Sequence, residues 1–367
     1  MKITRIEVEG FRKFRERTVF DLQDSLGRTL DLVVLAGPNG CGKTTVMDAV
    51  ALALQPSYQL PCVRPDIALT VRDIVSWKCL KASIVLELEF TQAELDATKN
   101  LLDLAQKSWD RPVDRRLRLK WEFPDDRSVS GVGFTTYEPY SGRALLSARK
   151  LVTELLTLGI VTPDWFERCG GVFTFHQQRS AMQKTIPPSI ARMLRPSHDF
   201  SSGEPFVTDD TCEILTTLAI KSKLNTRSND KSKFDSIRDH FARLCPPLQM
   251  DVVLNEYEEP SLEFTNGAGR FRYYGLSSGQ QAVLAYVVEL VDKRIHESVV
   301  MIDEVELHQE EIMQRKLLHG LQNLGHDNQL ILSTHSSYLT DIVPYDSLIK
   351  MGYLTADESR VEDAVHA

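Results

Sequence analysis

One loop constrains this chain more than any other segment, because it fits the phosphate-binding pattern GxxxxGK[ST]. Apolar residues 30–36 before the loop predict a buried strand. Residues 45–54 after it contain no helix breaker and predict a helix whose N-terminus faces an anion. In such a loop the lysine contacts the outer phosphates and the Ser/Thr hydroxyl binds Mg²⁺, so we expect a nucleoside triphosphate site. Its residues are Gly37, Pro38, Asn39, Gly40, Cys41, Gly42, Lys43 and Thr44, followed by Thr45 in the helix.

Composition excludes several classes of protein. With 367 residues the chain can bury a large core without disulfides, and its 6 cysteines include no CxxC pair that would indicate a zinc site. Residues 1–7 alternate charged and apolar side chains, unlike a targeting sequence, and no run approaches the roughly 18 apolar residues of a membrane helix. We therefore expect a cytoplasmic protein without a membrane partner.

The charge balance bears on nucleic-acid binding. The net charge is −8, from 43 basic and 51 acidic residues, which argues against a surface coated for nucleic acid but allows a local basic groove. The densest basic cluster spans residues 111–120, and the alternation over Arg116–Trp121 is typical of a strand with one solvated face. A DNA contact through this cluster is the alternative interpretation.

An apolar segment in the C-terminal half ends in two acids. Residues 298–302 predict a buried strand that delivers Asp303 and Glu304 at its carboxyl end, where open α/β sheets bind ligands. Neighbouring residues of a strand point to opposite sides, so the two acids can hold different roles. We expect Asp303 to anchor Mg²⁺ and Glu304 to act as general base on an attacking water.

Two further polar turns follow predicted strands. The segment Leu276–Gln280 precedes an apolar helix over residues 281–291 and could offer hydroxyls and free amides to an anion, although an ordinary helix cap is an equal alternative. Residues 330–334 predict another buried strand, which leads to His335. Taken alone, a histidine at such a position is more often structural than catalytic.

Together and in this order, the motifs resemble those of the ABC-type ATPases. The shared parts of that family are a phosphate loop, a Gln loop, an LSGGQ sequence, an Asp-Glu strand and a switch histidine. The resemblance covers nearly the whole chain and is weakest over residues 180–260. The matching segments are residues 37–44, Gln177 or Gln178, Leu276–Gln280, Asp303-Glu304 and His335.

The resemblance implies roles for these residues. Two ATPase units of the family pack head to tail around two ATP molecules, which implies that Ser277 of one unit caps the γ-phosphate bound by the other. Gly279 and Gln280 would contact the same nucleotide, and Ser278 replaces the first glycine of the family pattern. The implied catalytic residues are Lys43, Glu304 and His335, and the implied Mg²⁺ ligands are Thr44, Asp303 and Gln177.

The branch of the family is indicated by the opening segment and by the acid strand. Residues 3–14 resemble the start of SMC, RecF and OLD-type ATPases, in which the Phe-Arg-x-Phe segment lies beside the nucleotide, and this implies a contact for Arg12. The run Asp303–His308 resembles the DEPELH form of OLD-like and RecF-like proteins, with Val305 in place of proline. The segment between Lys43 and Ser277 is longer than in membrane transporters.

Two effector parts of related proteins are not expected. The prolines between Gln178 and Leu276 leave no room for the long coiled coil of SMC proteins. Too little chain follows His335 for the toprim nuclease domain of OLD proteins. We therefore expect an ATPase that acts on a separate effector.

The predicted fold is α/β, a P-loop NTPase of ABC-ATPase type with a mixed sheet core, an antiparallel strand-rich lobe and an inserted helical lobe. We expect an ATPase head over residues 1–179 and 261–367 and the inserted lobe over 180–260. The implied protein is an ATP-hydrolysing homodimer that controls a nuclease or toxin in bacterial anti-phage defence. A RecF/SMC-like DNA clamp in repair or recombination and a scaffold with slow hydrolysis are the alternatives.

Overall fold

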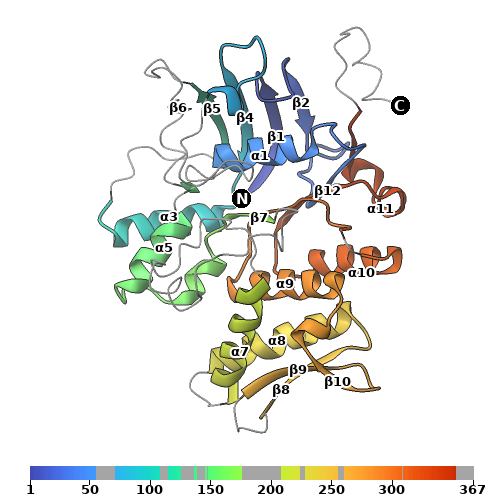
Figure 1. The fold of residues 1–367 in the computed structure, drawn as a ribbon. Helices are drawn as coiled ribbons and strands as arrows, with labels where there is room; N and C mark the ends of the chain where they lie inside the picture. Colours follow the sequence, from blue (N-terminus) through green and yellow to red (C-terminus); the bar gives the residue numbers. More distant parts are fainter. Residues whose placement is uncertain are drawn as a thin grey trace.

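Two large sheets and a lobe of helices form the molecule (Figure 1). The predicted α/β class is confirmed, although parallel and antiparallel pairings occupy separate sheets instead of mixing within one. The computed structural model describes residues 1–54, 71–107, 115–124, 136–138, 145–146, 148–175, 208–223, 228–254, 260–307 and 309–352.

The core sheet is parallel in each pairing that the structure describes. Its strands, in order across the sheet, are β13 (Leu348–Lys350), β3 (Leu32–Ala36), β12 (Gln329–Thr334), β11 (Val299–Ile302) and β7 (Val172–Phe175). All but the edge strand β13 are buried along their whole length, as is usual when both faces of a sheet are covered. The strands that precede the phosphate loop, the histidine and the acids are therefore neighbours.

The second sheet is antiparallel, and one helix separates it from the core sheet. Its strands, in order, are β2 (Thr18–Asp21), β1 (Lys2–Glu9), β4 (Ala82–Glu89), β5 (Arg116–Phe123) and β6 (Thr136–Glu138). Helix α1 (Lys43–Leu54) packs against β1 and β4 on one side and against β12 on the other. Because it is apolar on nearly every face, α1 is stable only when it is enclosed in this way.

The lobe farthest from the antiparallel sheet combines helices with a small sheet (Figure 1). Strands β8 (Gln249–Leu254), β9 (Pro260–Thr265) and β10 (Arg270–Arg272) pair antiparallel. In the turn between β9 and β10, Asn266 Oδ1 accepts hydrogen bonds from two backbone amides. The helices of this lobe are α7 (Thr208–Lys223), α8 (Ser228–Leu244) and α9 (Ser278–Asp292).

Strand pairing bears on the expected division of the chain. The expected boundary between residues 260 and 261 falls at the start of β9, which pairs with β8. The small sheet therefore packs as one unit with α7 and α8. The division into residues 1–179, 180–260 and 261–367 stays a prediction.

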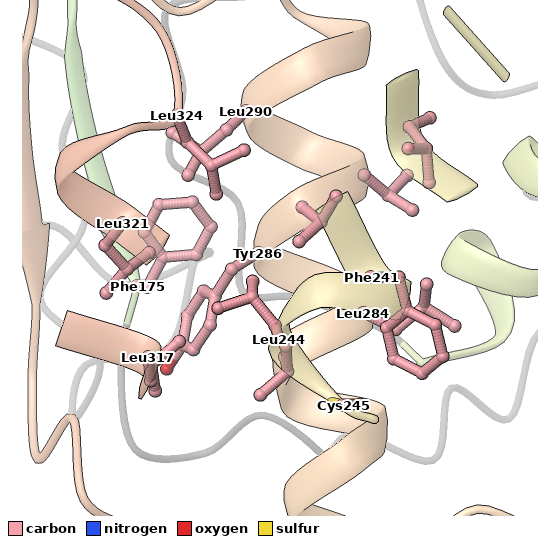
Figure 2. Close-up of a cluster of buried hydrophobic side chains, with 14 of the residues drawn as sticks. Phe175, Phe241, Leu244, Cys245, Leu284, Tyr286, Leu290, Leu317, Leu321 and Leu324 are labelled. Carbon is pink, nitrogen blue, oxygen red and sulfur yellow. The ribbon is translucent and has the colours of Figure 1, made fainter. Parts of the chain in front are cut away.

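One apolar cluster joins the lobe to the core sheet. Helix α10 (Glu311–Gln322) lies beside α8, and residues of α8, α9 and α10 meet Phe175 at the end of β7 (Figure 2). The rings of Phe175 and Tyr286 pack edge to face with centroids 5.3 Å apart. This cluster fixes the lobe against β7, the edge strand that lies beside β11. Its labelled members are Phe175, Phe241, Leu244, Cys245, Leu284, Tyr286, Leu290, Leu317, Leu321 and Leu324.

A separate group of helices lies beside the antiparallel sheet (Figure 1). It contains α3 (Gln92–Leu104), α5 (Ala148–Thr157) and the 3-10 helix η1 (Pro163–Glu167). The buried guanidinium of Arg149 donates to the carbonyl oxygens of Phe166 and Cys169 at 3.1 Å each, and also to those of Lys293 and Arg294. Burial lowers the pKa of Arg149 to about 10. Carbonyl dipoles therefore hold this cation and tie α5 to the end of α9.

Several elements follow the sequence predictions and others do not. The predicted strands and helices around the phosphate loop, the two acids and His335 are confirmed. Sequence patterns did not predict the short helices α2 (Val71–Ile74) and α11 (Ser337–Ile342), the 3-10 turns η2 (Tyr273–Gly275) and η3 (Tyr345–Ser347), α10 or β13.

Candidate nucleotide-binding site

The phosphate loop connects β3 to α1 at the carboxyl edge of the core sheet. Gly40 and Gly42 have φ angles of +82° and +110°, which L side chains rarely adopt. A Cβ on Gly37 would lie 2.2 Å from the carbonyl oxygen of Met351. Glycine is therefore required at the start of the loop by close packing and at its other two positions by backbone conformation.

Lys43 begins α1, and its ammonium group folds back into the loop. Nζ donates to the carbonyl oxygens of Gly37 at 2.9 Å and Pro38 at 3.2 Å, and it lies 3.2 Å from Nδ1 of His335. None of these partners is a carboxylate, although Lys43 is only 5% exposed. An anion at the N-terminus of α1 would therefore be attracted by both this cation and the helix dipole.

Thr44 and Asp303 form the pair that fits a divalent cation. The Thr44 hydroxyl lies 2.9 Å from Oδ2 of Asp303 and 3.2 Å from Oδ1, and the carboxylate is 3% exposed. Ser333 donates to Oδ1 of Asp303 at 2.5 Å and fixes its orientation. A threonine hydroxyl beside a buried aspartate at a strand end is the ligand set that holds Mg²⁺ in P-loop NTPases, so the residues fit this ion.

His335 lies between Lys43 and Glu304. Its Nε2 is 3.4 Å from Oε1 of Glu304, while its Nδ1 faces the lysine. Glu304 has a φ of +49°, and its amide donates to the Ser333 hydroxyl at 2.8 Å. The His335 amide donates to Oε1 of Glu306 at 2.5 Å. Parallel pairing of β11 with β12 brings these side chains together, because both strands end at the same edge.

The signature segment, Leu276–Gln280, spans the start of α9 and forms no hydrogen bond with the phosphate loop among those that the structure describes. Ser277 is exposed and forms a capping box with Gln280, in which each side chain accepts a hydrogen bond from the other residue's amide. Gln309 donates to the carbonyl oxygen of Gly279 at 2.8 Å. The helix-cap interpretation is therefore confirmed, and the nucleotide contact stays a prediction.

Arg12 and its neighbour Lys13 have different surroundings. Arg12 pairs with the buried carboxylate of Asp48 at 2.7 Å, so α1 holds its guanidinium, and the predicted nucleotide contact stays a prediction. The Lys13 ammonium instead donates to the carbonyl oxygen of Gly40 at 2.6 Å. Sequence reasoning did not single out Lys13, although it belongs to the same Phe-Arg-x-Phe segment.

Three more residues were predicted to belong to the site. Thr45 is buried in the first turn of α1. Gln177 and Gln178 lie outside the described residues.

The basic strand β5 carries acids beside its cations. Arg116 and Arg118 are exposed and alternate with buried leucines, which confirms the prediction of one solvated face. Across the sheet they lie opposite Glu89 and Glu87. The side chain of Arg118 is also 3.6 Å from Glu7. Acidic residues are therefore interleaved with the cations on this face.

The fold and the arrangement of Lys43, Asp303, Glu304 and His335 define the class of this protein. It is an ATPase domain of the P-loop class, with the fold of SMC heads. Residues 1–245 match the family described as "AAA ATPase domain", and residues 217–341 match "AAA domain, putative AbiEii toxin, Type IV TA system". The chain belongs to the AAA ATPase domain family, because the first match spans more than half of it.

Solved structures of SMC heads share the fold. An SMC head bound to the C-winged helix domain of ScpA is 14% identical, with a TM-score of 0.55 over 96% of this chain and 97% of that one. An SMC head with an extended coiled coil, bound to the C-terminal domain of ScpA derived from Pyrococcus furiosus, is 13% identical, with a TM-score of 0.52 over 95% and 93%. At this identity the likeness concerns the fold.

Relatives found by sequence match shorter segments. The chromosome partition protein Smc of Myxococcus xanthus is 40% identical over 50 residues, which are 14% of this chain and 4% of that protein. The aliphatic sulfonates import ATP-binding protein SsuB 2 of Paraburkholderia xenovorans is 31% identical over 114 residues, which are 29% of this chain and 46% of that protein. The chain thus spans less than half the length of either relative. In the part that the structure describes, no helix combines the length and apolarity required to cross a membrane.

Proposed function

We propose that this chain binds ATP with Mg²⁺, hydrolyses it as a head-to-tail homodimer and thereby controls a separate effector protein. One observation carries the proposal. The Thr44 hydroxyl contacts the Asp303 carboxylate, while His335 bridges Lys43 and Glu304, all at the ends of three neighbouring parallel strands. A phosphate cradle, a cation site and an acid–histidine pair are thus within reach of one another.

Each side chain has a proposed task in hydrolysis. Lys43 binds the outer phosphates, and Thr44 and Asp303 hold Mg²⁺, which when bound neutralises phosphate charge. Glu304 orients the attacking water and accepts its proton as the water oxygen bonds to the γ-phosphorus and the bond to ADP breaks. His335 hydrogen-bonds the γ-phosphate and reports its presence. Gln177 is proposed as a further contact to the metal site.

A second chain is proposed to complete the site. Ser277 bonds within the first turn of α9, and its exposed position leaves it accessible to another molecule. Helix starts bind anions well, so Ser277, Gly279 and Gln280 of one chain are suited to the γ-phosphate held by the other. ATP would then close a dimer around two nucleotides.

The proposed setting is bacterial anti-phage defence in the cytoplasm, with a nuclease or toxin as effector. The family description that matches residues 217–341 refers to a toxin system, which supports this setting. A DNA clamp is the alternative, supported by the shared fold of SMC heads. The acids that face Arg116 and Arg118 on the exposed sheet weaken it.

Substitution of Glu304 tests the hydrolysis proposal. We expect Glu304→Gln to lower kcat about 10²- to 10⁴-fold, because general-base catalysis is lost while ATP binding remains. Steady-state phosphate release and light scattering should show slow turnover and a persistent ATP-bound dimer. Glu310→Gln changes an exposed glutamate nearby and serves as the control. Normal turnover in Glu304→Gln would place the base elsewhere.

The loop and the DNA alternative have separate tests. Lys43→Ala should weaken ATP binding at least about 10-fold, because a charge-assisted contact is lost. Unchanged affinity would remove the loop from the proposal.

A salt-dependent affinity for duplex DNA that requires ATP would favour the clamp instead.

A further inference from the structure

A basic cavity lies between α8, α10 and α11, outside the nucleotide site. Its volume is about 820 Å³, and the cations and histidines of its lining come from two helices. No aspartate or glutamate is among its lining residues, all of which lie in the described part of the chain. In a chain of net charge −8 this is a local reversal of sign. The basic residues and histidines are His240, Arg243, Arg315, Lys316 and His319.

The cations of this α8–α10–α11 pocket are not neutralised internally. Nε of Arg243 donates to the carbonyl oxygen of Asp239 at 3.1 Å, which leaves most of its guanidinium for other contacts. Arg315 and Lys316 have no ion pair with any residue that the structure describes. An anionic partner could therefore bind them without breaking an existing pair.

Apolar surface lies beside these cations. Ile312 is 68% exposed at the start of α10, and Tyr338 contributes from α11. Leu244 and Gly320 also line the pocket, and Leu244 belongs to the cluster drawn in Figure 2. An apolar centre with a charged rim is the usual composition of a protein docking surface.

The pocket adjoins the helices that follow both catalytic segments. Helix α10 begins shortly after Glu304, and α11 begins directly after His335. The Ser336 hydroxyl donates to Oε1 of Gln314 at 2.6 Å and links the starts of these two helices. The third wall, α8, belongs to the lobe that carries the signature segment (Figure 1). A ligand here would contact the two helices that follow Glu304 and His335 and also the lobe that carries Ser277.

The chemistry of the pocket favours an acidic peptide segment over two other anions. Small-molecule sites enclose their ligand and fix it with buried polar groups, whereas Arg243, Arg315 and His319 are exposed. A nucleic-acid backbone requires an extended positive surface, whereas Asp239 and Glu311 flank the pocket on its own helices. A short run of carboxylates with an apolar side chain matches both the small positive area and Ile312.

We propose that the α8–α10–α11 pocket binds an acidic segment of a partner protein, with carboxylates on Arg315 and Lys316 and a large apolar side chain against Ile312. The identification of that partner as the effector rests on the proposed function. Occupation of the pocket biases the positions of α10 and α11 and thus of Glu304 and His335.

A peptide library displayed on phage tests the binding step without nucleotide. The full chain is immobilised and panned with random dodecapeptides, and selected peptides are titrated by fluorescence anisotropy. We expect enrichment of Asp and Glu around one large apolar residue, and at least about 10-fold weaker binding to Arg315→Glu/Lys316→Glu. Lys99→Glu/Lys150→Glu makes the same charge change on exposed positions of α3 and α5 and should bind as the wild type does. Equal binding by both double variants, or no acidic enrichment, overturns the proposal.

Two further measurements separate the proposal from its rivals and from the ATPase hypothesis. Ile312→Ser should weaken the selected peptides without abolishing folding, because Ile312 is largely exposed. Duplex DNA or inorganic triphosphate that binds through Arg315 and Lys316 more tightly than any acidic peptide overturns the proposal. Selected peptides should change ATP turnover at least about twofold. Peptide binding is measured without ATP, so failure of Glu304→Gln to slow turnover would leave the binding result intact.

Discussion

Ser333 sets the geometry of the two acids at the candidate site. It is fully buried, and its hydroxyl donates to Asp303 while accepting from the amide of Glu304. The left-handed backbone of Glu304 costs about 1 to 2 kcal/mol, and this hydrogen bond offsets part of that cost. In this conformation the Glu304 carboxylate lies 3.4 Å from Nε2 of His335.

His296 gives a pH dependence that can be measured. Burial lowers its pKa to about 4, and the stacked ring of His326, with centroids 4.2 Å apart, adds to the shift. Nδ1 of His296 accepts a hydrogen bond from the His326 amide at 3.1 Å, which a proton on that nitrogen would break. Of the other charges nearby, Glu167 raises the pKa, whereas Arg149 and Arg294 lower it.

The sign of this effect follows from proton binding. Between pH 6.5 and about 4 the unfolded chain binds a proton at His296 that the folded chain does not, so the free energy of unfolding falls as the pH falls. We expect urea unfolding to show that His296→Phe loses about 1 to 2 kcal/mol less stability than the wild type over this range, after an allowance for solvent screening. His319→Phe, at an exposed position, should behave like the wild type. A variant with the same pH dependence as the wild type would refute this assignment.

Local motifs predicted the site residues that stand at strand ends, and tertiary pairing determined the rest. Lys43, Asp303 and His335 each follow an apolar strand, so the sequence pattern predicts both the strand and the polar residue after it. The bonds of Ser333 and Glu306 depend on the register between β11 and β12, which no local pattern contains. Arg12 shows the same limit, because its partner Asp48 lies on a helix whose rotation is set by packing.

Packing between α8 and α10 is limited by Gly320. A Cβ at this position would lie 2.1 Å from Cδ2 of Leu244 and 3.0 Å from its Cγ. Alanine stabilises a helix interior by about 1 kcal/mol relative to glycine, but overpacking costs about 1 to 3 kcal/mol. The two effects oppose each other, and the close approach indicates that overpacking is the larger.

A double-mutant cycle can separate these effects. We expect Gly320→Ala to lower the free energy of unfolding by about 1 to 2 kcal/mol in the wild type, measured in urea. In a Leu244→Ala background the clash is absent, so the same change should be stabilising by up to about 1 kcal/mol. A stabilising effect in both backgrounds would show that the two helices have room to separate.

Long elements with a clear pattern were predictable, whereas short ones were not. Strand β4 alternates apolar and polar side chains except at Val85, and α1 is apolar after its first turn except at Asp48, so both could be predicted. Strand β13 has only 3 residues, and α11 has 6. Such segments are stable through contacts with β3 and α10, since isolated helices and strands of that length are not.

The core sheet and the helical lobe carry complementary halves of the proposed site. The phosphate loop and its acids stand on the core sheet, whereas Ser277 stands at the start of α9 in a capping box that needs no nucleotide. The cap at Ser277 is thus preformed, and the side chains of Ser277 and Ser278 are exposed. Because two ATP sites would form together, dimer stability should depend on ATP and on contacts made only across the dimer.

Ser277→Arg tests this arrangement in the Glu304→Gln background, where hydrolysis is slow. The arginine removes a helix cap worth about 1 kcal/mol and places a long side chain where the partner's γ-phosphate is proposed to lie, so the chain should fold but not close. We expect ATP affinity of the monomer within about twofold of the parent, and light scattering should detect no ATP-dependent dimer. Ser25→Arg, in an exposed turn, should dimerise normally. An undisturbed dimer in Ser277→Arg would mean that each chain completes its own site, because an arginine at a contacted γ-phosphate could not leave closure unchanged.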